Sequence, residues 1–149
     1  MNERRSNRGS SGSMLSQQDC ERIIVGGDAQ LLTQRAEAIG DRLARRLHLT
    51  TAQIRNVFGT VRQIEMNWGL RVTDKERQQA ARQLILLKPK MVYQAKRGRG
   101  GGVQAMADIL IPAIDLVGED RERFQNFVDF FEAILAYHTA ASTSRGGSR

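Results

Sequence analysis

The chain has 149 residues, of which 40% are hydrophobic and 26% charged, and its formal net charge is +7. This length fits one self-folding domain. No apolar run reaches the length of a membrane span and the amino terminus lacks the apolar core of a secretory signal, so we expect neither a membrane protein nor a secreted one. The single cysteine, Cys20, excludes an intrachain disulfide and a Cys-based zinc site, so the reducing cytoplasm is the expected compartment.

The positive charge is unevenly distributed. Residues 1–13 and 141–149 are rich in Ser, Gly and Arg and carry +2 each, and their few apolar residues predict disordered tails. This leaves +3 for a predicted helical domain over 14–140. Within that domain, residues 88–99 hold five cations and no acid, while the rest sums to −2. The domain is therefore nearly neutral with one concentrated basic segment.

Helical periodicity begins soon after the first tail. A short helix is predicted over 15–24, and apolar residues then recur at steps of three and four over 28–47, behind an aspartate that suits an N-cap. Thr50 and Gln53 form the spacing of a capping box, which satisfies two backbone donors at a helix start. This box opens the next helix, which Gly69 is expected to end.

A second capping box, Thr73 with Glu76, opens the helix that carries the basic segment. Pro89 lies inside this helix, where it removes one backbone hydrogen bond and clashes with the preceding turn. We therefore expect either a kink or two helices that meet near Lys88. The sequence RGRGGG over 97–102 is typical of a loop.

Two more helices complete the domain. Apolar residues over 106–117 predict one, with an expected kink at Pro112 and a stop at Gly118. The last begins at Asp120 and is apolar on more than one face, so it lies at the centre of the bundle or under a partner. Two of its aromatic residues lie off the main stripe and are candidates for contact between neighbouring copies, namely Phe130 and Tyr137. The predicted fold class is all-α, a compact bundle of about five helices.

No catalytic or metal-binding constellation is found in the sequence. His48 and His138 are far apart, and neither has a second ligand at metal spacing. The glycine-rich loop lacks the lysine and the preceding strand of a phosphate-binding loop, and Cys20 has no basic neighbour that would activate it. We therefore expect no enzyme activity, no metal and no cofactor.

Basic residues with an interleaved aromatic are the remaining signal. Lys90, Tyr93 and Arg97 fall at helical spacing and share one face, while Arg55 and Arg62 lie two turns apart on another helix. Such surfaces bind phosphate backbones, because cations release counterions and a ring packs on sugar or base. The alternative is that Tyr93 faces the core and the charges only solubilise. The candidate RNA-binding residues are Arg55, Arg62, Lys88, Lys90, Tyr93, Lys96, Arg97 and Arg99.

Three segments together resemble a known family. LTTAQIRNVF at 49–58, LLKPKMVYQAKR at 86–97 and FVDFFEAILAYH at 127–138 resemble the small subunit of type III-A CRISPR effector complexes, the Csm small subunit. The resemblance implies a non-catalytic helical protein that is present in several copies. It also implies that these copies stack beside the backbone subunits that hold the guide RNA and line the channel where guide RNA and target RNA pair. The backbone and large subunits are further implied partners.

By position, the resemblance assigns RNA contacts to Arg55, Lys88, Lys90 and Arg97, and more weakly to the other candidates. The chain departs from the family pattern at Asn56, where relatives often have a cation, and at Lys96, where they often have glycine. We expect Arg55 to converge with the cations of 88–97 in one electropositive groove.

Two other functions fit the same sequence. The first is a helical adaptor whose basic face meets an acidic protein and which has no RNA ligand. The second is a helix-turn-helix repressor, which is disfavoured because no compact turn precedes a short polar recognition helix.

Overall fold

The computed structural model describes residues 14–98 and 100–147, with side chains described up to residue 143. All regular secondary structure in these residues is helical, which confirms the all-α fold class. The described residues form six helices, close to the predicted number of about five, and they include the short helix predicted over 15–24. In chain order they are α2 (Gln17–Ile24), α3 (Ala29–Arg45), α4 (Thr51–Asn67), α5 (Asp74–Arg97), α6 (Gly102–Val117) and α7 (Arg121–Gly147).

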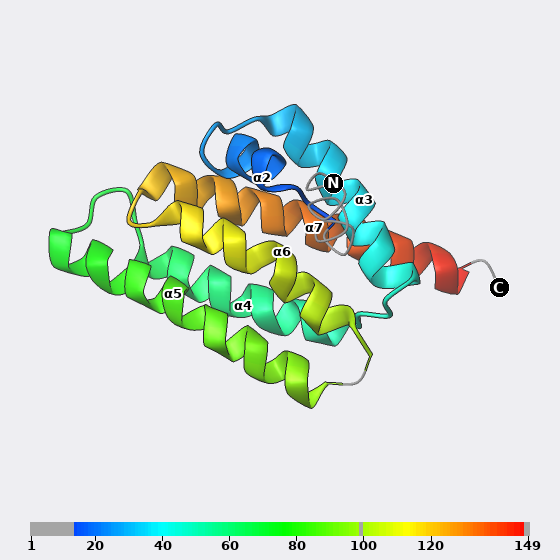
Figure 1. Ribbon diagram of the computed structural model, residues 1–149. Helices are drawn as coiled ribbons and strands as arrows, with labels where there is room; N and C mark the ends of the chain where they lie inside the picture. Colours follow the sequence, from blue (N-terminus) through cyan, green and yellow to red (C-terminus); the bar gives the residue numbers. More distant parts are fainter. Residues whose placement is uncertain (1–13, 99, 148–149) are drawn as a thin grey trace, which may run out of the picture.

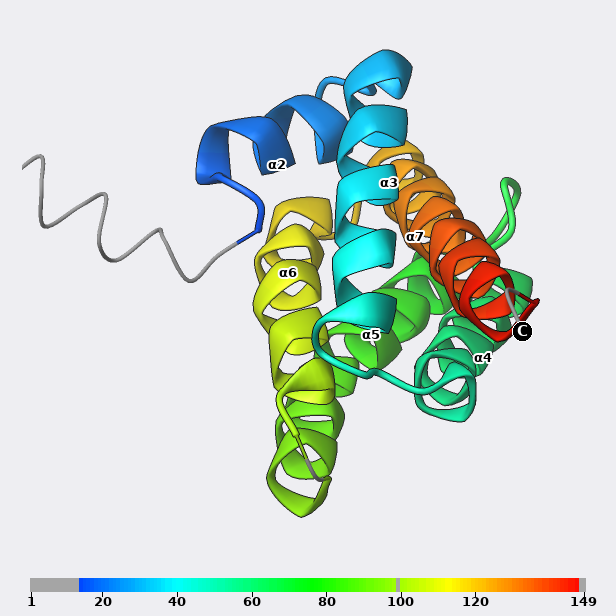
Figure 2. The same cartoon turned by 90° about the vertical axis from the view of Figure 1, so that its right-hand side faces the viewer.

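Helices α4, α5, α6 and α7 lie side by side as an antiparallel bundle (Figure 1). Helices α2 and α3 cover one side of this bundle and pack against α6 and α7 (Figure 2). The α4 and α5 pair lies on the side away from α2 and α3, so both helices keep long outer faces open to solvent.

Helix α7 is central, as its apolar residues on several faces predict. It packs against α2, α3, α4 and α6, and its phenylalanines are buried. Trp68 at the end of α4 stacks on Phe124, with ring centroids 4.6 Å apart. Phe130 is fully buried inside the chain, so the prediction that it contacts a neighbouring copy is wrong. Helices α3 and α4 pack on different sides of α7. The second apolar face of α7 is therefore used inside the monomer.

Both predicted capping boxes form. The Gln53 backbone N–H donates to Thr50 Oγ1 at 3.1 Å, and the Thr50 backbone N–H donates to Gln53 Oε1 at 2.9 Å. Thr73 and Glu76 make the same two bonds at the start of α5, at 3.1 and 2.8 Å. These boxes fix where α4 and α5 begin.

The expectation that two helices meet near Lys88 is wrong, because one helix runs through Pro89 from Asp74 to Arg97. Helix α6 likewise continues through Pro112. Pro89 lies on the exposed face of α5, and the side chain of Ile85, the residue whose carbonyl loses its helical partner, is 52% exposed. Water can satisfy a carbonyl on such a face, so the helix tolerates the proline.

The last helix extends further than the sequence predicts. Residues 141–147 belong to α7, whereas a disordered tail was expected over 141–149; residues 148–149, like the tail expected at 1–13, lie outside the described residues. Ala141 is buried, so the packed face of α7 continues into this segment and favours the helix.

The connection from α3 to α4 is contacted by α7 on one side and by the start of α6 on the other. His138 of α7 is fully buried, and its Nε2–H donates to the Leu49 carbonyl at 2.6 Å. From the other side, Gly102 approaches Leu49 so closely that a Cβ on it would lie 2.9 Å from the Leu49 Cα. The absence of a side chain at Gly102 therefore lets the start of α6 pack directly against the α3–α4 connection.

Candidate nucleic-acid interface

The contact line between α4 and α5, which we call the α4–α5 seam, carries amide side chains at both of its ends. The two helices are antiparallel, so Gln53 and Asn56 at the start of α4 lie near Gln94 at the end of α5. At the opposite end, Asn67 Nδ2 of α4 donates to Gln83 Oε1 at 3.4 Å. Each end of the seam opens into a pocket.

Three of the sequence-predicted residues, Lys90, Tyr93 and Arg97, form one exposed face of α5 beside this seam, which we call the basic face. The Arg97 guanidinium carbon lies 5.5 Å from the centroid of the Tyr93 ring. Tyr93 is 62% exposed, so it does not face the core. In the described part of the chain, neither Lys90 nor Arg97 takes part in an ion pair. Both cations are free to meet an anion.

Lys88 lies elsewhere on α5. Each residue turns an α-helix by about 100°, so Lys88 is roughly 160° around α5 from Lys90. There its ammonium group donates to Asp115 Oδ1 of α6, and its side chain is only 31% exposed. The structure therefore does not bring Lys88 to the basic face. Its partner is 27 residues away in the sequence, so no local pattern reveals the pairing.

Arg55 also fails to join the basic face. Helix α4 meets α5 through Gln53, and Arg55 is roughly 160° around α4 from that residue. Arg55 is exposed on a neighbouring side of the bundle, together with Arg62, which is two turns further along. Arg62 pairs with Glu65 at 2.8 Å and lies over the Phe58 ring. The expected single groove that joins Arg55 to the α5 cations is therefore not formed.

The two remaining candidates differ in position. Lys96 is exposed but lies about 100° around α5 from Arg97, toward the side away from α4. Arg99 lies outside the described residues.

The first pocket, which we call the Arg97 pocket, is a cavity of about 310 Å³ where the end of α5 meets the starts of α4 and α6. Sequence reasoning selected only Arg97 among its lining residues. The three amides among the others were missed as site residues because a lone amide in an amphipathic helix carries no signal until the helices pack. The lining residues are Gln53, Asn56, Gln94, Arg97, Gly98 and Val103.

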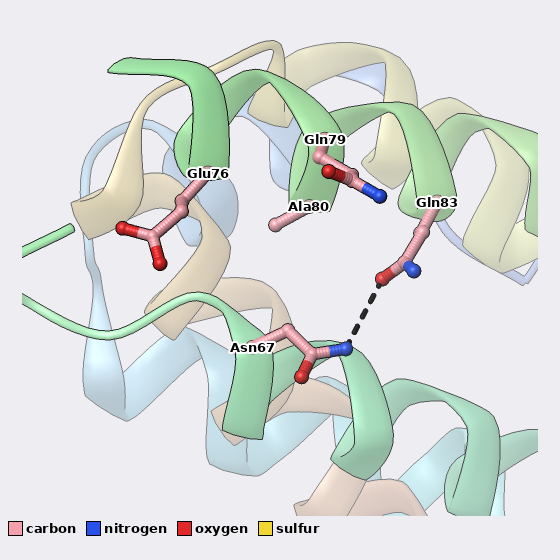
Figure 3. Close-up of a pocket in the computed structure, with 5 residues that line it drawn as sticks. All are labelled: Asn67, Glu76, Gln79, Ala80 and Gln83. Carbon is pink, nitrogen blue, oxygen red and sulfur yellow. Dashed lines mark hydrogen bonds between the residues drawn. The ribbon is translucent and has the colours of Figure 1, made fainter. Parts of the chain in front are cut away.

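The second pocket, which we call the Glu76 pocket, has about 280 Å³ and lies at the other end of the seam. Figure 3 shows its lining residues, with Asn67 of α4 joined to Gln83 of α5 across the seam. Hydrogen bonds from Thr73, first from its backbone N–H, lower the pKa of Glu76, so this carboxyl is ionised at neutral pH. This pocket therefore carries a negative charge where the Arg97 pocket carries a positive one.

The environments of Cys20 and His138 indicate structural roles for both side chains. Burial, and secondarily the charge of Glu21, raises the pKa of the Cys20 thiol to about 11, which suppresses the reactive thiolate. His138 holds the Leu49 carbonyl, as described above. Across residues 14–98 and 100–147, no group of three or more His, Cys, Asp and Glu side chains is arranged to hold a metal ion. None of the helices described there combines the length and apolarity that crossing a membrane requires.

A comparison with known protein families identifies a match over most of the chain. Residues 27–144 match the family described as Csm2 Type III-A. A search of the curated proteins and a search of the solved structures found no match. The matched range covers most of the chain and includes α3 to α6, the α4–α5 seam and both pockets. It also contains all three segments that carry the sequence resemblance, so that resemblance is confirmed. The chain belongs to the Csm2 family and is a small subunit of the type III-A CRISPR effector complex.

Proposed function

We propose that the chain is a non-catalytic RNA-binding subunit of this ribonucleoprotein and that its basic face contacts the phosphates of guide or target RNA. The observation that carries the proposal is the basic face itself, with Lys90 and Arg97 exposed and outside every ion pair described, around an exposed Tyr93 ring. Lys88 and Arg62, by contrast, are occupied by Asp115 and Glu65. We therefore rank Lys90 and Arg97 above the other candidate cations.

Backbone contacts suit a subunit that accepts any guide sequence. Such a subunit gains affinity from counterion release, which is independent of sequence and weakens as salt rises. The guanidinium of Arg97 can pair with two phosphate oxygens, and the exposed Tyr93 ring can pack on a sugar. These contacts bind and position RNA and need no nucleophile or general base.

Charge reversal tests the proposal. Lys90→Glu with Arg97→Glu is expected to weaken binding of a short single-stranded RNA by about tenfold or more at low salt, because two attractive contacts become repulsive. Fluorescence anisotropy of labelled RNA measures the change.

The matched control is Arg42→Glu with Arg46→Glu, at the end of α3. These exposed arginines also lie at a helix end, and their reversal changes the net charge equally. The control is expected to lower affinity only slightly. Equal losses for both pairs, in variants with unchanged thermal melting, would contradict the assignment of the basic face.

The family also implies contacts with neighbouring copies and with the backbone and large subunits, and we propose the cytoplasm as the compartment where the complex acts. For contact between copies, Tyr137 remains a candidate because its side chain is half-buried.

One observation favours the alternative function, a protein-interaction adaptor with no RNA ligand. Ile85, Leu86 and Val92 on α5 are 44–52% exposed, which suits contact with another protein. A native pull-down followed by sizing of bound RNA separates the two functions. Short RNA of uniform length supports the effector subunit, whereas recovery of protein partners without RNA supports the adaptor.

A further inference from the structure

The Arg97 pocket contains more than a phosphate contact requires. Its amides at Asn56 and Gln94 make no side-chain hydrogen bond to any other described residue, so their donors and acceptors are available. Gln53 uses Oε1 in the capping box, which leaves its Nε2 group for a ligand. At about 310 Å³ the cavity lies within the roughly 300–1,000 Å³ of small-molecule sites.

Arg97 connects this pocket to the basic face. It lines the pocket, and its guanidinium also lies over the ring of Tyr93, which is not a lining residue. A flat group that enters the pocket therefore meets a planar cation already held in place by an aromatic ring. Unpaired nucleobases are recognised by such stacking together with hydrogen bonds to their edges, which side-chain amides provide.

We propose that the Arg97 pocket binds one unpaired nucleobase of an RNA strand whose phosphates lie on the basic face. The base stacks on the guanidinium of Arg97, and the amides of Asn56 and Gln94 bond to its edge. This inference rests on the proposed RNA-binding function and adds a base contact to it.

Gly98 provides a way to fill the pocket without changing any charge. Its φ of −76° and ψ of 161° suit any residue. A Cβ on Gly98 would point at the lining groups Gln53 Nε2, 3.7 Å away, and Val103 Cγ2, 3.9 Å away. The nearest atom, the Gln94 carbonyl oxygen at 3.2 Å, would need to move only by a few tenths of an ångström.

The test compares two probes with the full chain: a short fluorescent single-stranded RNA and the same ribose-phosphate strand with abasic sites in place of every base. The intact strand is expected to bind at least about fivefold more tightly, since one stacked base contributes that much or more. Gly98→Val, and separately Asn56→Leu with Gln94→Leu, should lower affinity for the intact strand to the abasic level. Neither change should alter affinity for the abasic strand.

The control is Gln79→Leu with Gln83→Leu in the Glu76 pocket, which should keep the difference between the two strands. Equal binding of the two strands by the unmodified chain overturns the base pocket and leaves the phosphate contacts standing. A difference that survives in both pocket variants, with unchanged thermal melting, also overturns it. If neither strand binds, the proposed function fails, and the base pocket fails with it.

Discussion

At one end of the α4–α5 seam, the capping box of α4 lies beside the last turn of α5; at the other end, the capping box of α5 lies beside the last turn of α4. Each box contributes its third helical residue to a pocket, Gln53 to the Arg97 pocket and Glu76 to the Glu76 pocket. A glutamine and a glutamate can each complete a capping box, but only the glutamate adds a charge.

The two ends of the seam therefore start their helices in the same way but differ in the charge that they present to a ligand. The two ends share the same local solution for starting a helix, yet one leaves Arg97 unopposed and the other places a carboxylate in the pocket. Under the proposed function, a polyanion is attracted to the first end and repelled from the second.

The largest effect on RNA affinity is expected when the carboxylate found in the Glu76 pocket is introduced into the Arg97 pocket. Gln53→Glu keeps the capping box but places a carboxylate beside Arg97, where it competes with phosphate. One such charge is worth about 1 kcal/mol at 4 Å in water, so RNA affinity should fall about fivefold. Glu76→Gln is the counterpart and should leave affinity unchanged or slightly higher. Anisotropy titrations measure both, and equal affinities for the two variants would remove the contrast between the ends.

An effect of similar size, on stability rather than on binding, tests whether the two helix starts are built alike. Thr50→Ala and Thr73→Ala each remove the hydroxyl that accepts a backbone N–H, and each should lower the free energy of unfolding by about 1 kcal/mol. Urea denaturation measures the loss. A loss at one end only would mean that the caps contribute differently.

The smallest effect is a pH dependence confined to one end. The pKa of Glu76 is lowered in the folded chain, so the stabilisation by its carboxylate is present above about pH 4.5 and is lost as pH falls through the folded-state pKa. The difference in melting temperature between the unmodified chain and Glu76→Gln should therefore shrink from pH 7 to pH 3. Gln53 does not titrate, so the cost of Gln53→Ala should stay constant over that range, and a parallel decrease would argue against this origin.

The features that follow from local chemistry were predictable from the sequence. Capping boxes depend on residues three apart, and the glycine stop at Gly118 needs only a positive φ, which is 57° in the structure. The shared face of Lys90, Tyr93 and Arg97 follows from helical spacing alone.

The features that depend on packing were not predictable. Helical spacing places Arg55 on the polar side of α4, but the side of α4 that meets α5 is decided by the whole bundle. For the same reason the sequence does not reveal that Lys88 meets Asp115 or that residues from three helices line the Arg97 pocket. Pro89 is an exception to the rule that proline ends a helix. Helix α5 continues through it, because the proline lies on the exposed face of the helix.

The salt dependence of RNA binding tests most directly whether the basic face is where phosphates bind. The plot of the logarithm of affinity against the logarithm of salt concentration has a slope of about −0.7 per phosphate contact on single strands. Neutralising the face with Lys90→Gln and Arg97→Gln should make this slope shallower by about 1.4, while Arg42→Gln with Arg46→Gln should leave it nearly unchanged. An unchanged slope in the first variant, or an equal change in both, would contradict the assignment.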